Sequence, residues 1–192
     1  MIFQNKEADV IFVAGMHGSG KTTFCSGLSK ALGVPTYSAS TLIKAWSKDQ
    51  SWSEDKRARQ IRENQHALIS AVNAVKRHTP FFILDGHFVL LSSDGSAKNI
   101  DSKVFDELQI TGTILIQSAP EIVAERLTSR DRATWKIPLI VELMNAERGQ
   151  AIKYCLSRGI PYVIRSGDEP LDIDDGFLYE VSAWPVNVSP RS

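Results

Sequence analysis

One short segment near the amino terminus constrains the fold of this chain more than any other. Residues 15–22 read Gly-Met-His-Gly-Ser-Gly-Lys-Thr and match the pattern Gly-x-x-x-x-Gly-Lys-Ser/Thr. An apolar run at residues 10–14 comes directly before this segment and predicts a buried strand, and a helical pattern begins near Lys21. A strand, a glycine-rich loop and a helix in this order are typical of the phosphate-binding loop, or P-loop, of α/β proteins.

The residue types of the loop match the chemistry of a nucleoside triphosphate. Its glycines allow successive backbone N–H groups to point at a phosphate, and the following helix adds its positive end. We expect Lys21 to reach the β- and γ-phosphates of ATP and the Thr22 hydroxyl to bind a magnesium ion. The alternative is a glycine-rich turn without a ligand, but a chance match in a chain of 192 residues is on the order of one in a hundred. The expected ATP-binding residues are Gly15, His17, Gly18, Ser19, Gly20, Lys21, Thr22 and Thr23.

Apolar strand patterns alternate with helical patterns along the rest of the chain. Strands are expected at residues 9–14, 35–38, 81–85, 112–117 and 162–165, with helices between them. Several of these strands are apolar throughout, as expected when helices cover both faces of a parallel sheet. We therefore predict one α/β domain over residues 1–192, a P-loop NTPase three-layer fold with a five-stranded parallel sheet flanked by helices. Residues 185–192, with two prolines, are expected to form a tail.

Composition disfavours several classes of partner. Lys plus Arg equal Asp plus Glu at 22 each, so no overall positive field favours nucleic acids or acidic membranes. No run reaches the length of a membrane span, and the amino terminus lacks the pattern of a signal peptide, so we expect a cytoplasmic protein. Cys25 and Cys155 lie far apart without metal-binding spacing, and both are expected in buried helices. Anion binding must therefore be local, and a small nucleotide is the expected partner.

Three further segments follow the loop in a recognisable order. Residues 82–87 read Phe-Ile-Leu-Asp-Gly-His, residues 125–132 form an arginine-bearing stretch, and residues 147–151 read Glu-Arg-Gly-Gln-Ala before the last expected strand. With the loop, these segments resemble the nucleoside monophosphate kinase branch of P-loop proteins, most closely the archaeal type of adenylate kinase, over residues 10–165. The chain differs from that type at Lys21, where Ser is frequent, and at residues 38–44, where the acidic residue of the substrate motif is replaced.

The resemblance implies transfer of the γ-phosphoryl group of Mg-ATP to a nucleoside monophosphate. Asp85 ends a strand expected beside the loop strand and is expected to hold magnesium through water, the alternative being a turn-forming Asp before Gly. Arg126 and Arg130 lie four residues apart on one helix face, and the resemblance implies that they stabilise the γ-phosphate. The alternative is an exposed helix face on which these arginines pair with Glu121 and Glu125.

Four more residues are candidates for the acceptor site, and one is a further candidate for phosphate contact. Lys44 stands where the family usually places an Arg on the phosphate of the monophosphate, and Arg57 and Gln65 lie on one stripe of the next helix. His87 is expected to line the acceptor pocket. Arg148 is expected to contact a phosphate or to form a surface ion pair. The alternatives for the others are a surface cation, an interior amide and a loop histidine bonded to the backbone.

Three functions remain open at this level. The first is a nucleoside monophosphate kinase, and the second is a kinase of a hydroxyl on a sugar, a small acid or a nucleic-acid end. The third is an ATP-binding switch or slow ATPase that serves a protein partner. The cations Lys44 and Arg57 discriminate between these functions. Both kinases need one of them in the acceptor site, whereas a switch needs only the loop, Asp85 and a surface for its partner. A homo-oligomer also remains open.

Overall fold

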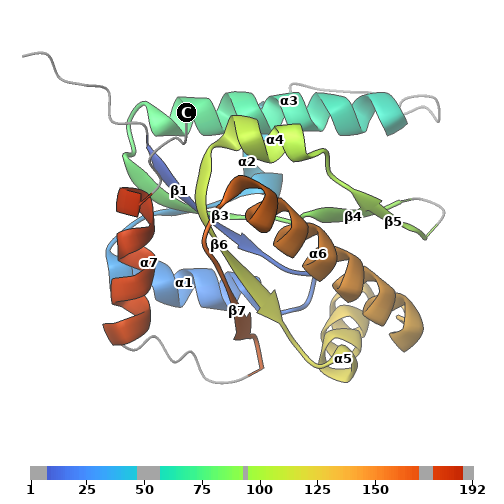
Figure 1. Cartoon of the computed structure of the whole chain (residues 1–192). Helices are drawn as coiled ribbons and strands as arrows, with labels where there is room; N and C mark the ends of the chain where they lie inside the picture. Colours follow the sequence, from blue (N-terminus) through green and yellow to red (C-terminus); the bar gives the residue numbers. More distant parts are fainter. Residues whose placement is uncertain (1–7, 47–56, 93–94, 169–174, 188–192) are drawn as a thin grey trace, which may run out of the picture.

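A five-stranded parallel sheet forms the centre of the protein (Figure 1). The structure is a computed structural model that describes residues 8–46, 57–92, 95–168 and 175–187. All four pairs of neighbouring strands are parallel, so the carboxyl ends of the strands meet at one edge. The strands, in their order across the sheet, are β2 (Thr36–Ser38), β3 (Phe81–Asp85), β1 (Asp9–Ala14), β6 (Ile110–Gln117) and β7 (Tyr162–Ser166).

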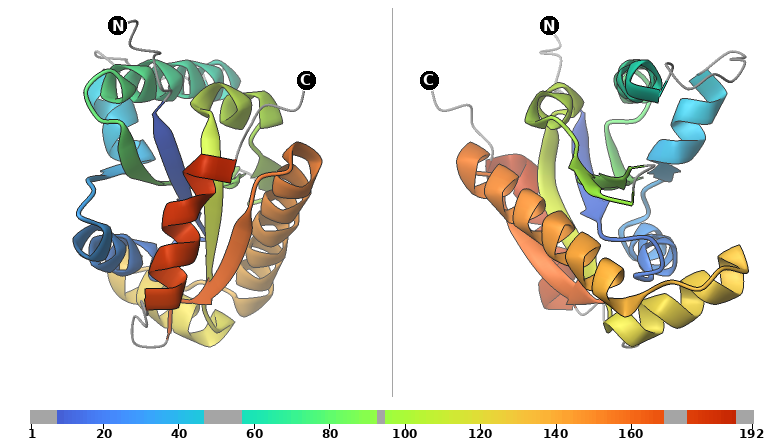
Figure 2. Two further views of the ribbon diagram at one scale, coloured as in Figure 1. Left: turned by 60° about the vertical axis from the view of Figure 1, so that its left-hand side comes forward. Right: turned by 90° about the vertical axis from the view of Figure 1, so that its right-hand side faces the viewer.

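Helices cover both faces of this sheet, which confirms the predicted three-layer fold. The helices α1 (Lys21–Leu32) and α7 (Asp175–Asn187) pack on one face. The other face carries α3 (Arg57–Lys76), α4 (Ser102–Leu108) and α6 (Ile137–Arg158), as Figures 1 and 2 show. The helices α2 (Ala39–Trp46) and α5 (Pro120–Asp131) follow β2 and β6 and lie at the carboxyl edge of the sheet.

The strand β1 contributes side chains to the cores on both faces of the sheet, because successive side chains of a strand point to opposite faces. Phe12 belongs to the core beneath α3, α4 and α6. Ile11 and Val13 belong to the core beneath α1 and α7. Each fully buried side chain of this size contributes roughly 1.5–3 kcal/mol, so the strand before the P-loop is held firmly from both sides. Cys25 and Cys155 are buried in α1 and α6, as predicted.

Two elements were not predicted from the sequence. A hairpin of β4 (Val89–Leu91) and β5 (Ala97–Asn99) follows β3 and packs on α6. The helix α7 places Phe177, Val181 and Trp184 in the core at helical spacing. This helix includes residues 185–187, the first part of the tail expected there, and residues 188–192 lie outside the described residues.

None of the described helices combines the length and the hydrophobicity that a bilayer crossing requires.

Candidate phosphate-binding and acceptor site

The P-loop leaves the carboxyl end of β1 and turns sharply into α1. Gly20, the residue before α1, has a φ of 91°, and a side chain there would place its Cβ 2.8 Å from the Gly167 carbonyl oxygen. At Gly15, with a φ of 146°, a Cβ would overlap the backbone of Ile116 on β6. The loop therefore lies directly against neighbouring backbone, and only glycine fits at these two positions.

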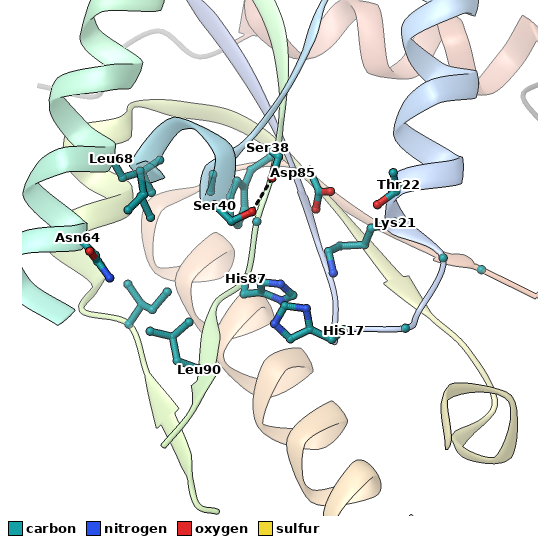
Figure 3. A pocket seen from close by; sticks show the side chains of 18 of the residues that line it. His17, Lys21, Thr22, Ser38, Ser40, Asn64, Leu68, Asp85, His87 and Leu90 are labelled. Atoms are coloured by element: carbon teal, nitrogen blue, oxygen red, sulfur yellow. Dashed lines mark hydrogen bonds between the residues drawn. The ribbon is translucent and has the colours of Figure 1, made fainter. Parts of the chain in front are cut away.

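Lys21, Thr22 and Asp85 lie side by side at the edge of the sheet (Figure 3). The register of the sheet places Asp85 on β3 opposite Val13 on β1, as the sequence predicted. Lys21 is buried, and its Nζ donates hydrogen bonds to the carbonyl oxygens of Gly15 at 2.7 Å and Met16 at 3.1 Å. Burial lowers the pKa of Lys21, while it raises the pKa of Asp85, and the attraction between the two charges opposes both shifts.

The donor set at this point fits magnesium. Thr22 supplies a hydroxyl and Asp85 a carboxylate, and oxygen ligands of this kind are those that magnesium prefers. Magnesium keeps several waters and binds phosphate oxygens, so two protein residues suffice. Within the described residues, no cluster of three His, Cys, Asp or Glu side chains forms a separate metal site.

The two arginines of α5 reach the P-loop because the apolar face of that helix packs on it. Val123 and Leu127 form a buried cluster with Met16 of the loop. Arg126 donates from Nη1 to the Gly18 carbonyl oxygen at 3.1 Å, and it also contacts the loop after β7. Arg130 pairs with its neighbour Asp131 at 2.6 Å.

Both arginines line the same pocket as Lys21. Arg126 further donates to the Ser118 hydroxyl at 3.3 Å and forms an ion pair with Asp168 at 3.3 Å. Among the described contacts, neither arginine pairs with Glu121 or Glu125. The pairing with Glu121 and Glu125 that was the alternative is not seen among these contacts, and the phosphate role of both arginines stays a prediction.

Glu147 of α6 supports the P-loop from behind. Its carboxylate accepts backbone hydrogen bonds from Gly15 at 3.1 Å, Phe88 at 2.9 Å and Val89 at 2.7 Å. The side chain is buried, and this burial raises the pKa of Glu147 to about 7, although the three hydrogen bonds oppose the shift. One carboxylate thus joins the start of the P-loop to the start of the β4–β5 hairpin. The Gly15 N–H therefore has a protein partner, although the sequence predicted that it binds phosphate.

Three of the predicted residues are not among the described residues that line the pocket. Arg148 is exposed on the outer side of α6 and does not line the pocket, because a step of one residue along a helix rotates the side chain by about 100° away from Glu147. Lys44 is exposed on α2, and its neighbour Ile43 lines the pocket instead. The side chain of Arg57 lies outside the described residues.

Two histidines meet where the P-loop faces the loop after β3. The ring centroids of His17 and His87 are 4.0 Å apart, and both residues line the pocket (Figure 3). Burial and the nearby Lys21 lower the pKa of His17 to about 4 and that of His87 well below its ordinary value. Both rings are therefore neutral at pH 7, so they add hydrogen-bonding capacity to the pocket without charge.

A pocket of about 910 Å³ extends from the P-loop to the β4–β5 hairpin. We call its two parts the phosphate end and the apolar end. The phosphate end is lined by Gly18, Gly20, Lys21, Thr22, Arg126 and Arg130. The apolar end is lined by Ile43, Leu68, Leu90, Ile100, Val104 and Phe105. Of the remaining predicted residues, Thr23, Gln65, Asp85 and His87 line the pocket, whereas Ser19 is buried behind it.

Sequence reasoning missed several residues of the site. Glu147 was detectable, since it lies four residues after Leu143 and four before Ala151, both of which are buried on the same stripe of α6. Asn64 lines the pocket next to Gln65, but no local pattern distinguishes it from a surface residue. Asp168 lies in the loop after β7 and reaches Arg126 of α5 across a long separation in sequence, so no local pattern indicates it.

Comparison with solved structures shows that this arrangement is a P-loop kinase-like fold. A kinase candidate from Chloroflexus aurantiacus J-10-fl has a TM-score of 0.55 at 18% identity, with 92% of this chain and 95% of that chain covered. Shikimate kinase from Bacteroides thetaiotaomicron has a TM-score of 0.51 at 18% identity, with 90% and 92% covered. A gluconokinase from Sinorhizobium meliloti 1021 has a TM-score of 0.50 at 13% identity, with 94% and 93% covered.

Comparison of the sequence with known families identifies the family of this chain. No curated protein matches the chain significantly. A family model described as AAA domain matches residues 14–136, which include the P-loop, Asp85 and both arginines of α5. Because this match spans more than half of the chain, the protein belongs to the AAA domain family.

Proposed function

We propose that the protein is a kinase that transfers the γ-phosphoryl group of Mg-ATP to a small acceptor. The observation that carries this proposal is the continuity of the pocket, in which the phosphate end opens directly into the apolar end. A switch or an ATPase requires only the phosphate end. A transferase also requires room for an acceptor next to the moving phosphoryl group, because holding donor and acceptor in line supplies much of the rate.

The residues of the phosphate end have distinct parts in this reaction. The backbone of the P-loop and the start of α1 bind the phosphates of ATP. Lys21, Arg126 and Arg130 compensate the negative charge that spreads over the oxygens of the moving phosphoryl group. Thr22 and Asp85 would hold magnesium, which when bound neutralises phosphate charge. The burial of Lys21 strengthens its interaction with phosphate, since the surroundings screen the charge less than water does.

The monophosphate acceptor and the archaeal adenylate kinase type remain predictions from the sequence. Gln65 and His87 line the pocket and support an acceptor site in this place. Lys44, which was expected to bind the acceptor phosphate, is exposed outside the pocket. The described residues therefore support an acceptor site more strongly than they support a charged acceptor.

Transfer can be tested with ATP that carries a label in its γ-phosphate. The purified chain, magnesium and labelled ATP are incubated with nucleosides, nucleoside monophosphates, sugars or hydroxy acids, and the products are separated. We expect label in an organic product, with a loss on the order of a hundredfold or more in Lys21→Ala. Lys30→Ala, on the exposed side of α1, is the matched control and should retain activity. Label found in inorganic phosphate alone, with every acceptor, would reject the kinase and favour the switch or ATPase.

A further inference from the structure

The two ends of the pocket differ in the cations that line them. Three cations, Lys21, Arg126 and Arg130, line the phosphate end. Among the described residues that line the apolar end there is no Lys or Arg. In Figure 3, Leu68 and Leu90 lie across the pocket from Lys21 and Thr22, with His87 between the two groups. The charges that bind phosphate are therefore gathered at one end.

Neutral hydrogen-bonding groups stand among the apolar side chains. Asn64 and Gln65 of α3 are half-buried and line the pocket, and within the described structure their side-chain amides have no hydrogen-bond partner. Ser38 and Ser40 also line the pocket, and their hydroxyls bond to each other at 2.9 Å. An amide both donates and accepts, so it matches the polar edge of an uncharged heterocycle.

The energetics of burial disfavour a charged acceptor here. A monophosphate acceptor would bring up to two further negative charges next to ATP, and among the described residues that line the pocket the only cations are the three that we assign to ATP, so its phosphate would lose hydration without a paired cation of its own. An uncharged planar body loses little hydration and gains contact with walls such as Leu68, Leu90 and Phe105. A sugar alone presents no planar apolar face to these walls, so it gains less contact with them than a nucleoside does.

We infer that the apolar end binds the base of a nucleoside, and that the protein phosphorylates the nucleoside hydroxyl. Asn64 and Gln65 contact the edge of the base, and the hydroxyl lies toward Asp85 and the phosphate end. This inference rests on the proposed kinase activity and names its acceptor class. It differs from the monophosphate kinase predicted from the sequence.

The transfer balances with ATP as the only co-reactant. The hydroxyl oxygen forms a bond to the γ-phosphorus, and the bond between that phosphorus and the β–γ bridging oxygen breaks. ADP leaves with the electron pair of the broken bond. The hydroxyl proton passes to water, and the products are ADP and a nucleoside monophosphate.

The test compares each nucleoside with its own monophosphate. The full chain, ATP and magnesium are incubated with the common ribonucleosides and deoxyribonucleosides, or with their 5′-monophosphates, and the products are identified by mass spectrometry. We expect at least one nucleoside to be converted to its monophosphate with kcat/KM on the order of tenfold or more above that of the matching monophosphate. Preferential conversion of monophosphates to diphosphates would overturn the inference and leave the kinase proposal standing.

A pair of variants tests the two amides. Asn64→Ala combined with Gln65→Ala should raise the KM for the nucleoside about ten- to a hundredfold and change kcat less, because two hydrogen bonds to the base are lost. Asn73→Ala, an exposed amide on the same helix, is the matched control and should leave KM unchanged. An unchanged KM in the double variant would overturn the assignment of the base to the apolar end.

Binding provides a readout that does not depend on turnover. In the presence of a non-hydrolysable ATP analogue, the nucleoside should raise the melting temperature of the unmutated chain and not that of the double variant. Absence of both transfer and thermal shift for every nucleoside would overturn the inference. If label still moves from ATP to another acceptor, the kinase proposal stands. If label appears only in inorganic phosphate, both proposals fall.

Discussion

Replacing Glu147 by Ala tests whether one carboxylate holds the P-loop in place. The substitution removes the acceptor of three backbone N–H groups, those of Gly15, Phe88 and Val89. A buried donor left without a partner costs about 1–3 kcal/mol. Water entering the space relieves part of this cost, so we expect a loss of about 3–6 kcal/mol of unfolding free energy at pH 5, where the side chain is a neutral acid whose two oxygens still accept these bonds. Activity should fall as well, since Gly15 begins the loop that binds phosphate.

The pH dependence of stability gives a second measure of the same residue. The pKa of Glu147 is about 7 in the folded protein and its ordinary value is 4.5. The folded state therefore holds this proton more tightly, and the resulting stability is present below pH 4.5 and is lost as pH rises through 7. The shift corresponds to a loss of about 3 kcal/mol across this window. Glu147→Gln cannot titrate. As pH rises through this window, the unfolding free energy of the variant should therefore increase by that amount relative to that of the unmutated chain.

Urea denaturation at several pH values between 4.5 and 8 measures both effects. Glu142→Ala is the matched control, because Glu142 is exposed on the same helix and its loss should change stability by no more than about 0.5 kcal/mol. A Glu147→Ala variant that is as stable as this control would refute the role of the carboxylate. A Glu147→Gln variant with the same pH profile as the unmutated chain would refute the raised pKa.

Three further substitutions test the site and the core. Asp85→Asn should lower kcat on the order of a hundredfold and change ATP affinity far less, as measured by steady-state kinetics and calorimetry, and a variant with full turnover would make Asp85 a turn residue only. Arg126→Lys keeps the charge but loses the planar fork, so kcat should fall about ten- to a thousandfold while the unfolding free energy falls by no more than about 1 kcal/mol, because Lys can keep part of the contacts of this half-exposed side chain. A larger loss of unfolding free energy would indicate a structural residue. Gly112→Ala places a Cβ into the ring of Trp184 and should cost about 1–3 kcal/mol with a shift in tryptophan fluorescence; unchanged stability and fluorescence would contradict the packing of Trp184 on β6.

The P-loop and the sheet could be predicted from the sequence because their signals are local. Eight consecutive residues specify the loop, and apolar runs of strand length specify the strands that surround it. The position of Asp85 could also be predicted, because Asp85 ends a strand that is expected beside β1 in this class of fold. The hairpin and α7 were missed because short strands and a helix that contains Pro185 carry weak local signals.

The tertiary structure alone decided which side chains enter the pocket. Glu147 and Gly15 are 132 residues apart, and their contact depends on how α6 packs against the sheet. The sequence predicted Arg148 and Lys44 as site residues, but both are exposed, whereas their neighbours Glu147 and Ile43 are turned toward the protein, Glu147 to the P-loop backbone and Ile43 to the pocket. The chemistry of the phosphate end was therefore readable from consecutive residues. The character of the apolar end, assembled from α2, α3, α4 and the hairpin, emerges only when distant segments are brought together by packing.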